Sequence, residues 1–117
     1  SPNIFRFGFY ANDLVYEYTD STLDKWVFWT CTYNVQTNER KLYQNSVNVY
    51  NDKATGPLLN DNTFFELGRY FYDYSTSWKG GNTGFIGYLD DFRIYNNYVM
   101  TQNNVNELNL ENLKTIS

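Results

Sequence analysis

The stretch from Gly84 to Met100, GFIGYLDDFRIYNNYVM, decides the fold. Its apolar residues recur with a period of two, which is typical of a β-strand with one buried face. The alternation changes phase once. Phe85 and Leu89 share one parity, and Phe92 and Ile94 share the other. Such a change requires a β-bulge, which inserts one unpaired residue and redirects the side chains that follow. The stretch therefore predicts a bulged strand that carries much of the buried apolar surface.

The polar residues at the phase change are Asp90 and Asp91. Two adjacent carboxylates repel each other unless a positive group lies beside them, and either Arg93 or a bound cation would supply that charge. Calcium takes six to eight oxygen ligands, which a bulged strand can offer as carboxylates and carbonyls, with loop Asn and Asp residues adding more. The residues thus leave two alternatives, a calcium site or an ion pair with Arg93 combined with turn capping.

The anchor stretch also carries a resemblance to a known family. The pattern Gly-Phe-x-Gly-Tyr-Leu-Asp-Asp-Phe-Arg-Ile-Tyr-Asn, followed by Met-Thr-x-x-x-Val-x-x-Leu, resembles the closing strand of a laminin-G-like jelly roll of the concanavalin A-like lectin/glucanase superfamily. The likeness extends back through Trp26 and the Leu42-Tyr43-Gln44-Asn45 hairpin, so that it spans roughly Asn3 to Leu108. It implies an all-β fold, an antiparallel jelly-roll sandwich with a short C-terminal helix. Relatives often hold one structural calcium ion at the rim, and the resemblance implies Asp90 or Asp91 as its ligand.

The resemblance also suggests how the domain is bounded. We expect residues 1–108 to form the laminin-G-like sandwich and residues 109–117 to form a C-terminal tail, which either extends the helix or packs as an irregular arm. Jelly rolls of this family have several strands before the point that corresponds to the start of this sequence. We therefore expect an incomplete sandwich, whose missing strands lie on an upstream segment or are supplied by another chain that completes the sheet.

The remaining strands follow from alternation and turn residues. The runs Ile4 to Tyr10 and Leu14 to Tyr18 alternate around a short polar turn, which predicts a hairpin. The run Asp24 to Tyr33 is apolar or small on both parities, which favours a central strand with Trp26 and Trp29 in the core.

A second hairpin and a helix complete the expected elements. The runs Arg40 to Gln44 and Val47 to Tyr50 flank Asn45-Ser46, where Asn45 tolerates a positive φ angle. Family members usually carry Asn-Gly here, so that Ser46 leaves the turn type open. Near the C-terminus, Thr101 is a suitable helix cap. Val105 and Leu108 are then expected to face inward.

Composition excludes several classes of function. The chain has 117 residues, 21% of them aromatic, a net charge of -4 and no cluster of Lys and Arg, which excludes a nucleic-acid partner. The mean hydropathy is -0.61 and no long apolar run is present, which excludes membrane insertion. The absence of histidine excludes histidine-based triads and His-bearing zinc sites. The single cysteine, Cys31, cannot form an internal disulfide and is interpreted as a small buried hydrophobe.

The candidate ligand site is the insert from Arg69 to Gly84, together with the polar loop from Asn51 to Asn62. Aromatic rings on alternate positions can form a flat platform for a sugar ring, whose hydroxyls an amide can orient. The same side chains can instead cover a sheet face or a protein interface, where Tyr and Trp are enriched. The candidate ligand-binding residues are Tyr70, Tyr72, Tyr74, Trp78 and Asn82.

We predict a non-catalytic binding or adhesion module of a larger protein, which recognises a glycan or a protein surface. One alternative is a structural part of a large assembly, whose sheet is completed by a neighbouring segment. Another is a glycoside hydrolase, but the two glutamates and the aspartate that such enzymes place at alternate strand positions have no counterpart here, and no catalytic residue is assigned. Relatives are mostly extracellular or on the cell surface, and the resemblance implies the same here; an intracellular assembly is the alternative.

Overall fold

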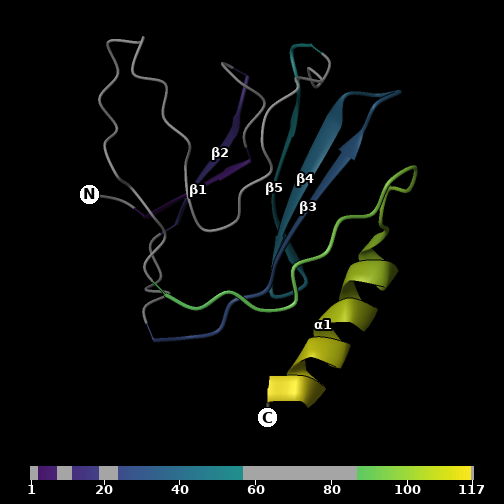
Figure 1. Cartoon of the computed structure of the whole chain (residues 1–117). Coiled ribbons are helices and arrows are strands. Elements are labelled where there is room, and N and C mark those ends of the chain that lie inside the picture. The colour runs from purple at the N-terminus through teal and green to yellow at the C-terminus, as the bar shows by residue number, and fades with distance from the viewer. Residues whose placement is uncertain (1–2, 8–11, 19–23, 57–86, 117) are drawn as a thin grey trace, which may run out of the picture. The chain divides into compact units, whose positions relative to one another are not determined.

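The computed structural model describes residues 3–7, 12–18, 24–56 and 87–116 (Figure 1). The chain divides into two compact units, one made of Ser1–Leu59 and Asn97–Ser117 and the other of Asn60–Asn96. The first unit holds two antiparallel sheets, of two and three strands, and a C-terminal helix. This confirms the expected β fold with a C-terminal helix and is consistent with an incomplete β-sandwich. No helix among the described residues is long and apolar enough to cross a membrane.

The first sheet is the predicted N-terminal hairpin. Strand β1 (Asn3–Phe7) pairs antiparallel with β2 (Leu14–Tyr18), in a register that sets Phe5 opposite Tyr16 and Phe7 opposite Leu14. Because side chains alternate across a strand, these four residues lie on one face of the sheet. Leu14 on that face is fully buried.

The second sheet contains β3 (Trp29–Asn34), β4 (Glu39–Gln44) and β5 (Val47–Lys53), in the order β3-β4-β5. Within the described residues β3 therefore lies at an edge, and β4 takes the central place predicted for the run Asp24 to Tyr33. Burial on two faces of a strand does not by itself require neighbours on both of its edges. Trp29 on one face of β3 stacks on Phe5, and Thr32 on the other is 6% exposed.

The turn between β4 and β5 confirms the second predicted hairpin. Asn45 and Ser46 have φ angles of 50° and 72°, so that both central residues are left-handed, as in a type I′ turn. Asn45 also holds the backbone of Phe28, the residue before β3, through two hydrogen bonds. The Phe28 N–H donates to Asn45 Oδ1 at 2.9 Å, and the Asn45 N–H donates to the Phe28 carbonyl at 2.8 Å. Trp26, just before this point, is 54% exposed and does not lie in the core as predicted.

Helix α1 (Gln102–Ile116) begins at the predicted cap. The Asn104 N–H donates to Thr101 Oγ1 at 3.2 Å, and the Thr101 N–H donates to Asn104 Oδ1 at 2.9 Å, so that each residue satisfies a backbone donor of the other. Val105 is fully buried and Leu108 is half-buried, as expected. The helix continues through the expected tail, which is the first of the two alternatives considered for that segment.

Candidate interaction surface

The predicted ligand-binding residues Tyr70, Tyr72, Tyr74, Trp78 and Asn82 lie outside the described residues. The predicted metal ligands Asp90 and Asp91 are described, in the second unit. These two groups of candidates stay predictions, and the geometry below concerns the residues that the structure describes.

The described part of the anchor stretch does not form the predicted strand. No residue from 87 to 100 belongs to a strand. An extended segment becomes a strand only when a neighbour pairs with its backbone groups, and the described residues provide no such neighbour for it. A local irregularity is nevertheless present at the predicted position, because Asp91 has a left-handed φ angle of 52°.

Asp91 forms a bidentate ion pair with Arg93. Arg93 Nε lies 2.6 Å from Asp91 Oδ1, and Arg93 Nη2 lies 3.1 Å from Asp91 Oδ2. The two side chains are 38% and 31% exposed. Within the described residues no group of three or more His, Cys, Asp or Glu could hold a metal ion. Arg93 thus supplies the positive charge that the carboxylate pair was expected to need, and a calcium ion there would have to compete with it.

The residues around this ion pair expose apolar side chains. Between positions 88 and 95, which we call the apolar segment, five large hydrophobic residues are exposed: Tyr88 at 86%, Leu89 at 51%, Phe92 at 52%, Ile94 at 66% and Tyr95 at 45%. Single exposed apolar residues are common on soluble proteins, whereas a concentration of them, here five within eight consecutive positions, is a feature of binding surfaces. The apolar segment is therefore the candidate interaction surface.

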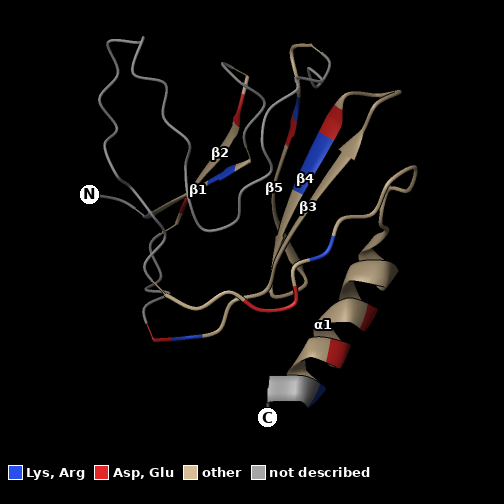
Figure 2. Ribbon diagram, viewed as in Figure 1, with Lys and Arg blue, Asp and Glu red and all other residues tan. Residues whose placement is uncertain are grey.

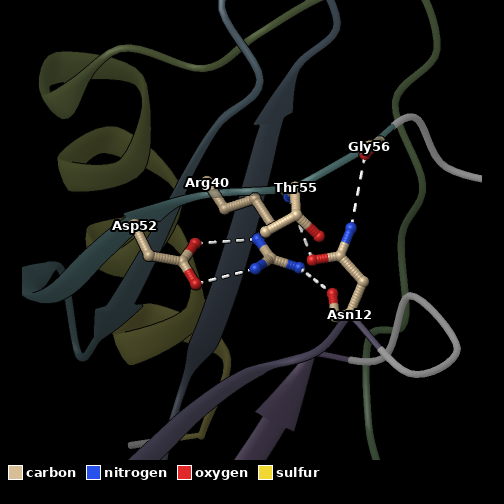
Figure 3. A network of polar contacts seen from close by, with 5 residues as sticks. All are labelled: Asn12, Arg40, Asp52, Thr55 and Gly56. Atoms are coloured by element: carbon tan, nitrogen blue, oxygen red, sulfur yellow. Dashed lines mark hydrogen bonds and ion pairs between the residues drawn. The ribbon is translucent and has the colours of Figure 1, made fainter.

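A buried arginine joins the two hairpins of the first unit (Figure 3). Arg40 is 2% exposed, and its Nε and Nη2 atoms each lie 2.7 Å from a carboxylate oxygen of Asp52. Its Nη1 donates a hydrogen bond to the carbonyl of Asn12. The Asn12 side chain accepts from the Thr55 N–H at 3.1 Å and donates to the Gly56 carbonyl at 3.4 Å. This set, the arginine clamp, ties the residue before β2 to β4 and to the chain after β5.

The arginine clamp was not predicted from the sequence. The predicted two-residue turn at Asn45-Ser46, continued without a bulge, would set Asn51 opposite Arg40. The structure has a register shift between Leu42 and Tyr43, and this shift brings Asp52 opposite Arg40. Acidic and basic residues do adjoin along β4 (Figure 2), where Lys41 also lies 3.7 Å from Glu39.

A row of aromatic rings lies between the two hairpins. Phe5 stacks on Trp29 with centroids 4.3 Å apart, and Tyr18 lies 5.6 Å from Trp29. Tyr16 lies 6.0 Å from Tyr18 and 6.1 Å from Tyr50. These separations suit favourable ring contacts. Trp29 is half-buried in this row and Tyr50 is 41% exposed, so that the rings hold the hairpins together with one end at the surface.

The Cys31 thiol and four of the described carboxylates have environments that affect their reactivity. Burial raises the pKa of the Cys31 thiol to about 12, so that the group stays protonated and a poor nucleophile at neutral pH. Several carboxylates are held in ion pairs with basic side chains, in the pairs Arg6–Asp13, Arg40–Asp52, Lys41–Glu39 and Arg93–Asp91. This arrangement favours structure over acid–base chemistry at those carboxylates.

Comparison with known proteins gives two findings. A family model described as concanavalin A-like lectin/glucanases superfamily matches residues 3–106. The fold is similar to the crystal structure of an S-layer domain-containing protein (residues 221–444) from Clostridium thermocellum ATCC 27405, with a TM-score of 0.63 and 20% sequence identity. The match covers 86% of this chain and 46% of that one, so that the chain spans less than half of the related structure. No curated protein matches significantly.

Proposed function

The chain belongs to the concanavalin A-like lectin/glucanases superfamily, and on that premise we propose that it is a non-catalytic recognition module of a larger protein that binds a protein surface. The family alone does not decide this, because one scaffold can host lectins, adhesion modules and hydrolases. The observation that carries the proposal is the apolar segment, with its five exposed large hydrophobic side chains.

The chemistry of the apolar segment favours a protein over a sugar as its target. Leu89 and Ile94 are exposed between the aromatic residues, and branched aliphatic side chains offer no flat face for a pyranose ring. Aromatic residues and arginine are enriched at protein interfaces, and the apolar segment contains both. The Asp91–Arg93 pair would give that interface a polar element for orientation.

Two other functions remain as alternatives. A glycan target would depend on the predicted platform of Tyr70, Tyr72, Tyr74, Trp78 and Asn82, which lies outside the described residues. The edge of β5 supports a role in a large assembly, because within the described residues β5 pairs with β4 alone, and an open edge can accept a strand from another segment or chain.

The structural relative suggests where the protein acts. Its description as an S-layer domain-containing protein supports an extracellular or cell-surface location for this chain.

The proposal is tested by measuring how the labelled chain binds to the surface of the cells that produce it. We expect Phe92→Ala to weaken binding about tenfold, because a central aromatic anchor contributes on the order of 1–2 kcal/mol. Val35→Ala removes a side chain that is 70% exposed in the first unit and serves as the control. Protease treatment of the cells should abolish binding. Binding that survives protease, or equal loss in both variants, would contradict a protein target at the apolar segment.

A further inference from the structure

Helix α1 is attached to the turn between β4 and β5 through backbone carbonyls. Gln102 Nε2 donates to the Ser46 carbonyl at 2.6 Å, and Asn109 Nδ2 donates to the Asn45 carbonyl at 3.5 Å. The two amide side chains are seven residues apart, and therefore lie on one face of the helix two turns apart. Val105, which is fully buried, lies between them on that face. The attachment thus depends on the left-handed turn holding its two carbonyls in place.

The helix has little stability of its own. Five of its fifteen residues are asparagine, and it also contains the β-branched residues Val105, Thr115 and Ile116. These residue types have low helix propensity, and a helix of about 15 residues is marginal in water even for good formers. Its first turn contains no acidic residue that would stabilise the helix dipole. Of its larger apolar residues, Leu110 is 59% and Leu113 is 51% exposed, so that little apolar burial offsets these losses.

We propose that α1 is a conditionally folded strap, which is helical only while it is attached to the Asn45–Ser46 turn and which opens as a unit without opening the sheet. Regions with few buried apolar contacts open locally at a lower free energy than the core. Because coupling between two sites is reciprocal, a ligand or partner that stabilises the turn also stabilises the strap. This inference is independent of the function proposed for the apolar segment.

The test compares amide hydrogen exchange of α1 and β4 in the whole chain. The double variant Gln102→Ala/Asn109→Ala changes the stability of α1 in two opposite ways. Alanine is the better helix former, which stabilises the helix, but it cannot form the bonds to the turn. If α1 depends on the turn, protection of residues 106–113 falls about tenfold while protection of β4 stays unchanged. Asn103→Ala, at an exposed helix position, is the matched control and should leave α1 protection equal or slightly higher.

The opposite results would overturn the inference. Unchanged or increased α1 protection in the double variant would show that the helix is stable by itself. Equal protection of α1 and β4 in the unaltered chain, or an equal fall in both in the double variant, would show that the two open together and that α1 is no separate strap.

Discussion

Arg40 and Asp52 form a bidentate ion pair in which both nitrogen–oxygen distances are 2.7 Å, and the Arg40 side chain is 2% exposed. A charge in such a place is costly unless every donor is matched. Here Asp52 accepts two of the hydrogen bonds and the Asn12 carbonyl accepts a third. The pair therefore holds the Arg40 guanidinium in the position from which it also binds the Asn12 carbonyl, which links the first hairpin to the second sheet.

Removal of the carboxylate is expected to destabilise the fold strongly. Asp52→Ala leaves the Arg40 guanidinium buried without its counter-ion, which should lower the free energy of unfolding by about 3 kcal/mol. Arg6→Ala breaks a pair in which the arginine is 56% exposed, and should cost under about 1 kcal/mol. Denaturant titration of both variants measures the difference. Similar small losses in the two variants would show that the clamp is not essential.

The turn between β4 and β5 offers a stabilising substitution. Ser46 has a φ angle of 72°, a conformation that is strained for a residue with a Cβ atom. Ser46→Gly should raise the free energy of unfolding by about 0.5–1 kcal/mol, since relief of strain exceeds the added freedom of the unfolded chain. Ser46→Ala keeps the strain and should give no gain. The denaturant midpoint with an unchanged slope measures both, and equal midpoints for glycine and alanine would contradict the assigned turn.

Because the half-buried Cys31 thiol has a raised pKa, we predict a loss of stability at high pH. The pKa of the Cys31 thiol rises from 9.0 to about 12 on burial, so that between these values the unfolded chain ionises and the folded chain does not. Stability therefore falls as pH rises through this window, by at most about 1.4 kcal/mol per pH unit. The difference in unfolding free energy between the unaltered chain and Cys31→Ala should be constant below pH 8 and should shift against the unaltered chain above pH 9. A constant difference up to pH 10.5 would show that the thiol ionises freely when folded.

The calcium proposal at Asp90 and Asp91 makes a prediction of its own. Arg93 neutralises Asp91, so that Arg93→Gln should increase calcium affinity, whereas Asp90→Asn should decrease it. Melting temperatures with calcium and with a chelator report the affinity, because a ligand bound to the folded state alone raises the melting temperature. If calcium shifts the melting temperature of neither the unaltered chain nor Arg93→Gln, the proposed calcium site at Asp90 and Asp91 is contradicted.

Local features of the fold were predictable from the sequence. Both hairpins and the start of the helix are determined by residues that are close in sequence. Examples are the alternation from Leu14 to Tyr18, the Asn45-Ser46 turn and the cap at Thr101. Elements that depend on residues distant in sequence were not predictable. The arginine clamp requires Asn12 to meet Arg40 across two hairpins, and the anchor stretch would need a pairing strand that its own pattern does not specify.

The candidate site was predictable only in part. The phase change in the sequence predicted an irregularity near Asp91, where the structure has a left-handed φ angle, and charge predicted the Arg93 ion pair as one alternative, which the structure shows at Asp91. The exposure of the apolar segment did not follow, because alternating apolar residues indicate burial unless the place of each strand is known. Trp26 was misjudged for the same reason, since a large apolar side chain is buried only where another element covers it.

The central claim is that the apolar segment is a binding surface for a protein, and site-specific photo-crosslinking tests it most directly. A photoreactive phenylalanine analogue at position 92 of the full-length protein, in the cells that produce it, should form a discrete protein adduct. The same analogue at position 35, which is also exposed, should not. Loss of the adduct on Tyr88→Ala would support a shared surface. No adduct at position 92 above that at position 35 would contradict the proposed function.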